Sequence, residues 1–349
     1  MSADLDADVL VVGGGPIGLA AAIEARLAGL SVVVVEPRPG PVDKACGEGL
    51  MPGAVAALAR LGVVPAGHPL TGIGYRAGDR RVDHLFGTGP GLGVRRTTLH
   101  AALAARATAL GVGHVVGRVR SIDQDRDSVG AAGIRARWLL GCDGLHSTVR
   151  RLTGLAGAQP APAARRGGDR TRFGLRRHFR VPAWTDLVEV HWVPTVEAYV
   201  TPVADDVVGV ALLGPPRVDY DAALGTFPAL VARLGQSEPA GPLRGAGPLR
   251  QRTTARTAGR VRLVGDASGY VDALTGEGLR VGLAQAAAVI AFLDEAAGYE
   301  RAWSASTRDY RALTTALVRV ATSPLRRAIV PVAVAAPTLF GAAVERLAR

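Results

Sequence analysis

The chain has 349 residues, of which 48% are hydrophobic and 20% are charged; this excludes a mainly disordered or low-complexity protein and allows two domains or one large composite domain. Its formal net charge is +11, from 41 basic and 30 acidic residues, but Lys44 is the only lysine and the acids are spread along the chain. This arginine bias is typical of coding bias rather than of a phosphate-binding face, so we expect no nucleic-acid partner and instead a basic rim that attracts an anionic cofactor or substrate.

The first 36 residues have the pattern of a βαβ unit. Residues 9–12 form a short, continuous apolar run, which is typical of a buried parallel strand. A glycine-rich turn at 13–18 follows, and the Ala- and Leu-rich segment 19–28 predicts a helix. Residues 31–35 are apolar and β-branched, and they end in Glu36, which predicts a second strand.

Helix and strand patterns continue along the rest of the chain. Helices are expected at residues 52–61, 98–110, 219–234 and 278–295, and most of the chain beyond 295 is also predicted to be helical. Strands are expected at 115–122, 134–140, 171–180, 187–192, 198–203, 207–213 and 261–264, with short strand-like pieces within 70–93. The segment 154–168 is rich in Ala, Pro, Gly and Arg and is expected to cross between domains. These patterns predict one sheet assembled from distant segments, with a β-rich insert between them.

Gly13, Gly15 and Gly18 follow one another at the spacing of a dinucleotide-binding turn. The first glycine permits a tight turn, the second lets the backbone approach a pyrophosphate, and the third lets helix and strand pack closely. The start of the next helix supplies free N–H groups and a positive dipole end for the phosphates. Glu36 lies 18 residues after Gly18, where its carboxylate can accept hydrogen bonds from a ribose diol. Because Glu36 would repel a 2′-phosphate, the pattern favours FAD or NAD over NADP.

Two further motifs follow predicted strands. Residues 141–150 contain Asp143-Gly144, and residues 262–269 contain Gly265-Asp266, followed by residues 272–278 and a long helix. Each motif alone is an ordinary strand-to-loop turn, and Asp266 alone would also suit a helix N-cap. In this order and spacing they make the sequence resemble the FAD-dependent flavoprotein monooxygenase superfamily, which includes geranylgeranyl reductases and flavin-dependent halogenases. The resemblance covers about residues 8–295.

The resemblance implies an α/β fold with a Rossmann-like FAD-binding domain of the glutathione-reductase type. It also implies an inserted antiparallel β-sheet substrate domain and a C-terminal helical segment. The FAD-binding domain is expected in three parts at 1–72, 96–164 and 256–300, with a substrate-domain excursion at 73–95. The substrate domain is expected at 165–255 and the C-terminal helices at 301–349.

FAD is the cofactor that the resemblance implies. Asp143 corresponds to a position near the pyrophosphate, Asp266 to one that binds the ribityl hydroxyls, Arg96 to a contact on the phosphate side, and Val119 to one at the adenine. The long helix after 278 would aim its N-terminus at the flavin and stabilise the negative charge of its reduced form. The complete set of predicted cofactor-binding residues is Gly13, Gly15, Pro16, Ile17, Gly18, Glu36, Pro37, Arg38, Cys46, Gly47, Arg96, Val119, Asp143, Gly144, Gly265, Asp266, Gly276, Glu277 and Gly278.

The loop 44–52 supplies two candidate pocket residues, Cys46 and Glu48. It is similar to the Cys-Gly-Gly type loop of geranylgeranyl reductase-like proteins, which approaches the isoalloxazine. Glu48 stands where those proteins often have glycine. The alternative for Cys46 is a small packed core residue, and Lys44 is expected to be a solvated residue or a cofactor contact.

His191, Trp192 and Tyr199 are candidate pocket residues on strands of the insert. The tryptophans of the family's motif on the Tyr199 strand are missing, which counts against a halogenase. The alternative for each of the three is a half-buried core residue of the sheet. By strand alternation, Glu189 and His191 share one face, while Val190 and Trp192 share the other. No residue is assigned a catalytic role.

A cluster of arginines lies before and within the first strand of the insert. It predicts either a solvated face or a patch for an anionic group, and it consists of Arg165, Arg166, Arg170, Arg172, Arg176, Arg177 and Arg180. The two cysteines, Cys46 and Cys142, indicate neither a disulfide framework nor a metal site.

The chain has no second dinucleotide fingerprint, so electrons are expected from transiently docked NAD(P)H or from a separate reductase. The N-terminus lacks the pattern of a secretory signal, and a cytoplasmic location is expected. Residues 329–344 are uncharged and contain two prolines, which predicts a packed or surface-lying helix pair, with membrane contact as the alternative.

The resemblance implies an FAD-dependent oxidoreductase. The leading hypothesis is a monooxygenase, or hydroxylase, that acts through a peroxyflavin on an apolar aromatic or polyketide-type small molecule. The alternative is an FAD-dependent C=C reductase that resembles geranylgeranyl reductase and acts on an isoprenoid; the Cys46 loop and the stretch 272–278 favour it. A flavin-dependent halogenase and a flavin-binding protein without turnover are further alternatives.

Overall fold

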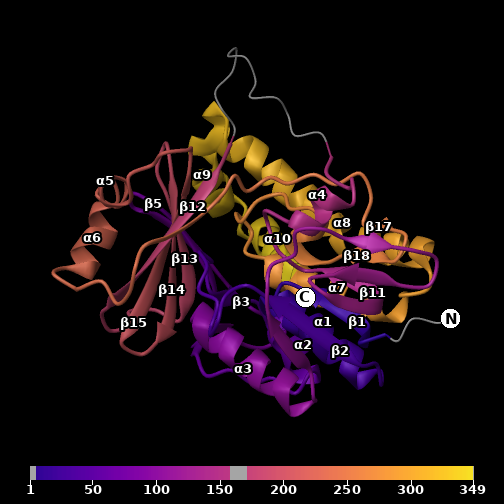
Figure 1. Ribbon diagram of the computed structural model, residues 1–349. Helices are drawn as coiled ribbons and strands as arrows, with labels where there is room; N and C mark the ends of the chain where they lie inside the picture. Colours follow the sequence, from indigo (N-terminus) through magenta and orange to yellow (C-terminus); the bar gives the residue numbers. More distant parts are fainter. Residues whose placement is uncertain (1–4, 158–170, 349) are drawn as a thin grey trace.

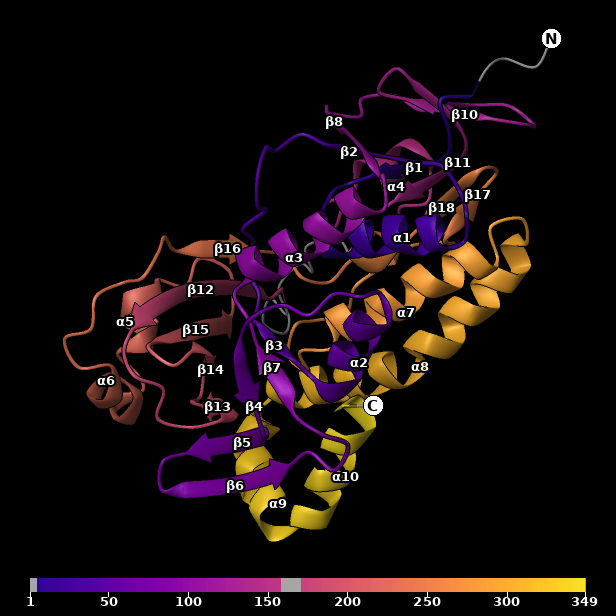
Figure 2. The same cartoon turned by 90° about the horizontal axis from the view of Figure 1, so that it is seen from below.

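The computed structural model describes residues 5–157 and 171–348. Figure 1 shows two separate β-sheets, with the C-terminal helices, in yellow, packed beside both of them. Figure 2 shows the same arrangement from below, with helices α7 (Gly278–Ala291) and α8 (Ala296–Ala321) along the first sheet and α9 (Ile329–Ala335) and α10 (Pro337–Ala348) beside the second.

The first sheet has eight strands drawn from both halves of the chain. Its main order is β17 (Thr257–Ala258), β18 (Val261–Leu263), β11 (Ile134–Gly141), β1 (Ala7–Val12), β2 (Val32–Glu36) and β8 (Gly113–Val116). The short strands β9 (Asp123–Gln124) and β10 (Val129–Ala131) extend from β11. All pairs from β18 to β8 are parallel. The expectation that distant segments assemble one sheet is therefore confirmed.

Strand alternation gives the first sheet two apolar faces. Val9 and Val11 pack under α1 (Pro16–Leu27), α3 (Arg96–Ala109) and α7, in the largest core of the molecule. Leu10 and Val12 face the opposite side, where they pack with residues of β10, β18 and α4 (Thr148–Leu152). Strands buried on both faces need continuous apolar sequence, which is why residues 9–12 have no polar side chain.

The second sheet has seven strands in the order β16 (Arg244–Ala246), β12 (Phe173–Arg180), β15 (Val207–Gly214), β14 (Glu197–Ala204), β13 (Leu187–Trp192), β5 (Gly72–Ala77) and β6 (Arg80–Leu85). The expected antiparallel sheet is confirmed, with one exception: β13 and β5 pair in parallel. These two strands lie more than 100 residues apart, so no hairpin turn forces them to run in opposite directions.

A small three-stranded sheet of β3 (Gly49–Leu50), β7 (Gly91–Gly93) and β4 (His68–Leu70) lies next to helix α2 (Pro52–Arg60). Several sequence-based boundaries differ from the structure. The expected helix at 219–234 is divided into α5 (Tyr220–Leu224) and α6 (Pro228–Leu234), because Pro228 starts a new helix rather than continuing the old one. The expected strand at 115–122 ends at Val116.

Each face of the second sheet has its own helical cover. Helices α5 and α6 cover one face through residues such as Tyr220 and Leu230. The C-terminal helices cover the other face, where Leu317 and Val330 pack with side chains of β5 and β13. The predicted helix pair over 329–344 is confirmed as α9 and α10, separated at Ala336 and preceded by the short η2 (Pro324–Ala328).

Among the described residues, no single helix is long and apolar enough to cross a bilayer. The pair Pro324–Ala335 and Pro337–Ala348 is long and apolar enough only when both helices are taken together, and the pair is bent by 101°. Part of the predicted crossover at 154–168, from 158 onward, lies outside the described residues.

Candidate functional site

A cavity of about 960 Å³ lies between the two sheets and the C-terminal helices. All of the predicted cofactor-binding residues except Gly18 line it. Among the predicted pocket residues, Cys46, Glu48 and Tyr199 line it, whereas His191 and Trp192 do not. The cavity continues from the glycine-rich turn along the inner face of the second sheet to the C-terminal helices.

The three glycines of the first turn have three different roles. Gly13 has a φ of 105°, and an added Cβ would lie 2.6 Å from the carbonyl oxygen of Cys142. An added Cβ on Gly18 would lie 1.8 Å from the carbonyl oxygen of Gly13, so Gly18 permits the turn to pack on its own helix rather than facing the cavity. Around Gly15 there is open space on the cavity side. This is the place where a diphosphate can approach the backbone at the start of α1.

Two side chains hold this turn in position. Glu36, at the end of β2, accepts a hydrogen bond from the backbone N–H of Gly14 at 2.9 Å and another from Nε of Arg38 at 2.7 Å. His100 donates from Nε2 to the carbonyl oxygen of Gly14 at 2.8 Å. Burial lowers the pKa of His100, so the ring is neutral with its proton on Nε2. His100 was not among the predicted residues, because nothing in the α3 sequence pattern marks it.

Asp143 caps α4 and retains one free oxygen. Its Oδ2 accepts from the backbone N–H groups of Thr148 at 2.6 Å and Val149 at 3.0 Å. Its Oδ1 is buried and has no hydrogen-bond partner among the described residues, although the side chain lines the cavity. A buried carboxylate oxygen without a partner is costly unless a ligand donates to it. This observation fits a bound hydroxyl-rich cofactor such as FAD.

Arg150 joins the second and third motifs. Its guanidinium donates to the carbonyl oxygens of Leu145 at 2.8 Å and Ala267 at 3.1 Å, and to the side chain of Gln251 at 2.8 Å. It therefore fixes the Asp143 loop relative to the Gly265-Asp266 turn. Arg150 lies within the motif at 141–150, but no local pattern predicts this positioning role.

Lys44 lies between the second and third motifs. Its Nζ is 4.0 Å from Oδ2 of Asp266, and an added Cβ on Gly144 would lie 3.2 Å from the same amine. Lys44 and Asp266 are each about one-third exposed and both line the cavity. The amine thus faces the space between the two loops.

Glu277 is a buried carboxyl at the start of α7. The residue is 1% exposed, its Oε2 is paired with Nε of Arg280, and its Oε1 has no partner among the described residues. Burial raises the pKa of Glu277 to about 7, with Arg280 opposing the shift. Gly276, just before it, has a φ of 71°, which favours glycine.

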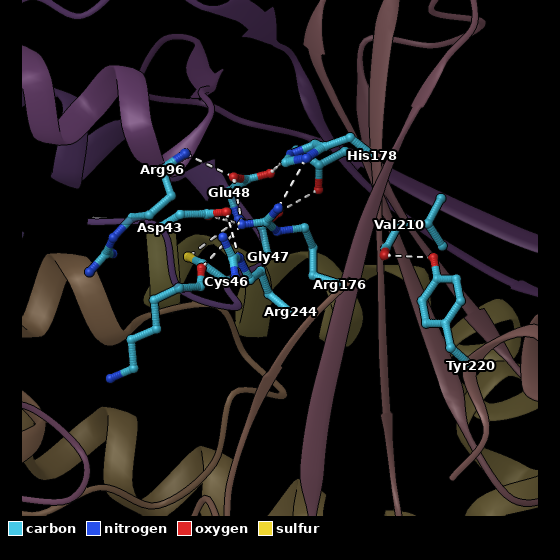
Figure 3. Close-up of polar contacts among 12 residues, drawn as sticks. Asp43, Cys46, Gly47, Glu48, Arg96, Arg176, His178, Val210, Tyr220 and Arg244 are labelled. Atoms are coloured by element: carbon cyan, nitrogen blue, oxygen red, sulfur yellow. Dashed lines mark hydrogen bonds and ion pairs between the residues drawn. The ribbon is translucent and has the colours of Figure 1, made fainter. Parts of the chain in front are cut away.

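The loop that carries Cys46 and Glu48 is clamped by a buried polar cluster (Figure 3). Glu48 has a φ of 61° and is 3% exposed. Its Oε1 accepts from the backbone N–H of Arg96 at 2.8 Å, and its Oε2 contacts Nε2 of His178. Arg176 donates to Nδ1 of His178 at 3.0 Å. Because Nδ1 must accept from the guanidinium, the ring proton lies on Nε2 and is donated to Glu48.

The predicted arginine cluster is divided between different environments. Arg176 is buried, and it contacts Asp43, whose other oxygen accepts from Arg244. Arg172 is also buried, between Glu197 and Asp272. The remaining described members, Arg177 and Arg180, pair with Asp221 and Asp206, and Arg165, Arg166 and Arg170 lie outside the described residues. The burial of Arg172 and Arg176 differs from a solvated face, which was one of the two predictions for the arginine cluster.

Glu197 joins three parts of the molecule. It contacts Arg172 on one oxygen and Arg326 of η2 at 2.6 Å on the other. Arg172 in turn donates to Asp272 at 2.9 Å, close to the start of the 272–278 stretch. This buried network was not predicted, because its contacting pairs are 25 to 129 residues apart in sequence.

The insert strands divide the three candidate pocket residues. Tyr199 lies on the inner face, and its hydroxyl donates to the carbonyl oxygen of Leu274 at 2.6 Å. Trp192 also points inward, but it packs against Tyr75 in the core. His191 is on the opposite face, where it contacts Glu189 at 3.2 Å and meets Phe227 edge-on. The predicted alternation of 189–192 is confirmed. Trp192 is a core residue of the sheet, which was the alternative to a pocket residue.

Residues 6–165 match the family model described as an FAD binding domain. This part of the chain is similar to FAD binding domains. The finding confirms FAD as the cofactor and the resemblance to the FAD-dependent flavoprotein monooxygenase superfamily. The open space at Gly15 and the free oxygen of Asp143 belong to this part of the chain and are consistent with FAD binding.

Two curated relatives match parts of the chain. A rifampicin monooxygenase from Streptomyces venezuelae is 36% identical over 166 residues, which are 43% of this chain and 34% of that protein. A menaquinone reductase from Mycolicibacterium smegmatis is 61% identical over 57 residues, which are 16% of this chain and 14% of that protein. The chain thus spans about a third or less of the length of these relatives. A solved flavoprotein/dehydrogenase from Cytophaga hutchinsonii has a TM-score of 0.76 at 19% identity, over 88% of this chain and 85% of that one, and shows a shared fold.

Proposed function

We propose that the protein is an FAD-dependent monooxygenase that adds one oxygen atom to an apolar, electron-rich small molecule. The observation that carries this proposal is the single cavity that joins the cofactor-binding turn to the apolar inner face of the second sheet. The similarity of 43% of the chain to a rifampicin monooxygenase supports the reaction type. The apolar wall supports the substrate class, because apolar surface binds apolar ligands by excluding water from both.

The chain's own residues would hold FAD at three places. The backbone at Gly15 would take the diphosphate, Glu36 the adenosine ribose, and Asp143 and Asp266 the hydroxyl groups between the two ends. Lys44 would add a positive charge beside this path. Bound FAD supplies two-electron transfer and, when reduced, activation of molecular oxygen.

The remaining residues of the cavity exclude water and keep its wall rigid. Three residues of the inner face present apolar side chains to the cavity: Val188, Val190 and Leu213. The hydroxyl of Tyr199 donates to the carbonyl oxygen of Leu274, so Tyr199 presents its ring to the cavity rather than a free polar group. Glu48, held by His178 and the N–H of Arg96, fixes the loop that closes the cavity beside Cys46. A rigid site that excludes water prevents side reactions such as the hydrolysis of reactive intermediates.

A second candidate function is reduction of a carbon–carbon double bond in an isoprenoid. The specific observation in its favour is the 61% identity with a menaquinone reductase over 57 residues. The cavity also extends past the second sheet into a wholly apolar section lined by the C-terminal helices, which would accept a long hydrocarbon. In this function the same residues hold FAD, and the cavity binds the substrate without oxygen.

For either reaction, we propose that electrons come from NAD(P)H that docks transiently or from a separate reductase, and that the protein works in the cytoplasm. An arginine-rich surface would attract the phosphates of a nicotinamide dinucleotide. Flavin bleaching by NADH or NADPH in an air-free cuvette tests the direct route. Bleaching only after addition of a reductase and its donor would support the second route.

The two functions differ in what they consume. The FAD-loaded protein is supplied with reductant and with apolar aromatic or isoprenoid compounds, and oxygen uptake and product mass are measured. A product heavier by one oxygen atom, with oxygen uptake in equal amount, supports the monooxygenase. A product heavier by two hydrogen atoms that forms equally well without air supports the reductase. A protein that takes up no FAD would contradict both.

A further inference from the structure

The far end of the cavity is apolar and reaches the surface. Every residue between 325 and 347 that lines it is Ala, Val, Leu, Ile or Phe. Three of them are also strongly exposed: Leu325 by 65%, Val332 by 61% and Leu339 by 72%. Residues that line a cavity and face solvent mark its mouth, so the cavity opens among exposed hydrophobic side chains. Large exposed apolar groups gathered at one place indicate an interaction surface.

The same corner carries arginines, of which Arg326 is buried and paired with Glu197, while two others have no acidic partner among the described residues. From residue 310 to residue 344 the chain has four arginines and no Asp or Glu. Arg319 and Arg327 are exposed, and neither forms an ion pair with another described residue. The segments next to the apolar mouth therefore carry two unneutralised cations, Arg319 near the end of α8 and Arg327 in η2.

We propose that this corner, formed by the exposed faces of η2, α9 and α10, docks onto an anionic lipid bilayer and that the apolar substrate enters the cavity from the lipid. Apolar side chains at the cavity mouth would enter the acyl boundary, while Arg319 and Arg327 would lie at the level of the headgroups. The substrate part of this inference rests on the proposed function, whereas the docking part does not.

The shape of the corner fits a surface position rather than a crossing. The two apolar helices are bent by 101° at Ala336 and are shorter than a bilayer requires. Helices α9 and α10 also pack on the second sheet through Val330, Phe340 and Val344, so one side of each is already covered. Only the other side is free to lie in the interface, as in amphipathic helices that bind one leaflet.

A second copy of the chain is a poorer occupant of this corner. A two-fold contact places each surface against itself, which would bring Arg319 and Arg327 of one copy near those of the other. The anionic bilayer has the complementary charge. A dimer through this surface would also close the cavity mouth, whereas a bilayer delivers apolar molecules to it.

Vesicle flotation of the full, FAD-loaded chain tests the proposal without any turnover. We expect binding to vesicles of phosphatidylcholine with phosphatidylglycerol, and markedly weaker binding to phosphatidylcholine alone. The double variant Val332→Gln/Leu339→Gln should reduce partition about a hundredfold, since each lost apolar side chain contributes about a factor of ten. The matched control Leu27→Gln/Val64→Gln changes one Leu and one Val that are 50% and 85% exposed elsewhere and should change partition less than about twofold.

Several outcomes would overturn the docking proposal: no flotation of the unmodified chain, equal loss in both double variants, or binding that ignores anionic lipid. A concentration-dependent dimer that Val332→Gln/Leu339→Gln dissociates would instead assign the corner to a second copy. Flavin absorbance of each sample is recorded in parallel, so failure to hold FAD, which would contradict the proposed function, is distinguished from failure to bind lipid.

Discussion

Replacing Glu277 with Gln should reverse part of the pH dependence of stability. The carboxyl is buried at the start of α7, and its pKa is raised from an ordinary 4.5 to about 7. Between these two values the folded protein binds a proton that the unfolded chain does not. Folding stability from this group is therefore full below about pH 4.5 and is lost as the pH rises toward 7.

The size of the effect follows from the shift. The pKa of Glu277 is about 2.5 higher in the folded protein than in the unfolded chain. With both ionisation equilibria included, the contribution of Glu277 to the free energy of unfolding therefore falls by about 2.5 kcal/mol between about pH 5 and pH 8. Gln cannot ionise and keeps nearly the same shape. Glu277→Gln should therefore gain about 2.5 kcal/mol relative to the unmodified chain over this pH range.

Urea unfolding of the FAD-saturated protein at several pH values measures this difference. The matched control is Glu295→Gln, because Glu295 is 56% exposed and pairs only with the exposed Arg301 among the described residues. We expect its stability difference from the unmodified chain to change little with pH. Parallel stability curves for Glu277→Gln and the unmodified chain would refute the reasoning, since they would mean that Glu277 stays ionised when folded.

Three further predictions concern the cofactor turn, the buried clamp and the cavity wall. Gly15→Ala should fold normally, because its added Cβ would enter only the open cavity side, but it should bind FAD at least about tenfold more weakly in a visible-absorbance titration. Gly18→Ala should instead fail to fold, since its added Cβ would overlap a backbone oxygen. Glu48→Ala should cost about 3–5 kcal/mol in denaturant unfolding, because it leaves His178 without its acceptor in a buried site; a loss below about 1 kcal/mol would mean that water enters the cluster. Tyr199→Phe should lower stability by about 1–2 kcal/mol, since a buried carbonyl loses its donor, and unchanged stability would contradict that assignment.

Local patterns in the sequence predicted the cofactor side of the cavity well. The turn at Gly13 to Gly18, Glu36 and the loops at Asp143 and Asp266 each follow a buried strand, and the parallel strands bring their ends to one edge of the sheet. Such motifs are readable because each is set by a few neighbouring residues whose spacing reflects backbone geometry. The parallel arrangement then places them together without any further information.

The other side of the cavity depends on contacts between distant residues, which no local sequence pattern predicts. Glu48 meets His178 across 130 residues, and no periodic pattern connects the two positions. Alternation correctly separated His191 from Trp192, but alternation gives only the face of a strand and not which part of that face borders the cavity. The arginines at Arg172 and Arg176 were indistinguishable from solvated ones until their distant carboxylate partners were in place.

The strand order has a consequence for how the protein is made. The segment that matches the FAD binding domain, residues 6–165, lacks β18, which pairs with β11, and it includes β5, which pairs with β13 of the later insert. A ribosome therefore releases the cofactor-binding turn at 13–18 long before β13 and β18 exist. The nascent chain must keep one edge of β5 unpaired until β13 has emerged at about residue 192, and one edge of β11 unpaired until β18 has emerged at about residue 263. Such exposed edges are the surfaces that chaperones protect from aggregation. Cofactor capture should accordingly be a late step in synthesis, following completion of both sheets rather than of the first half of the chain.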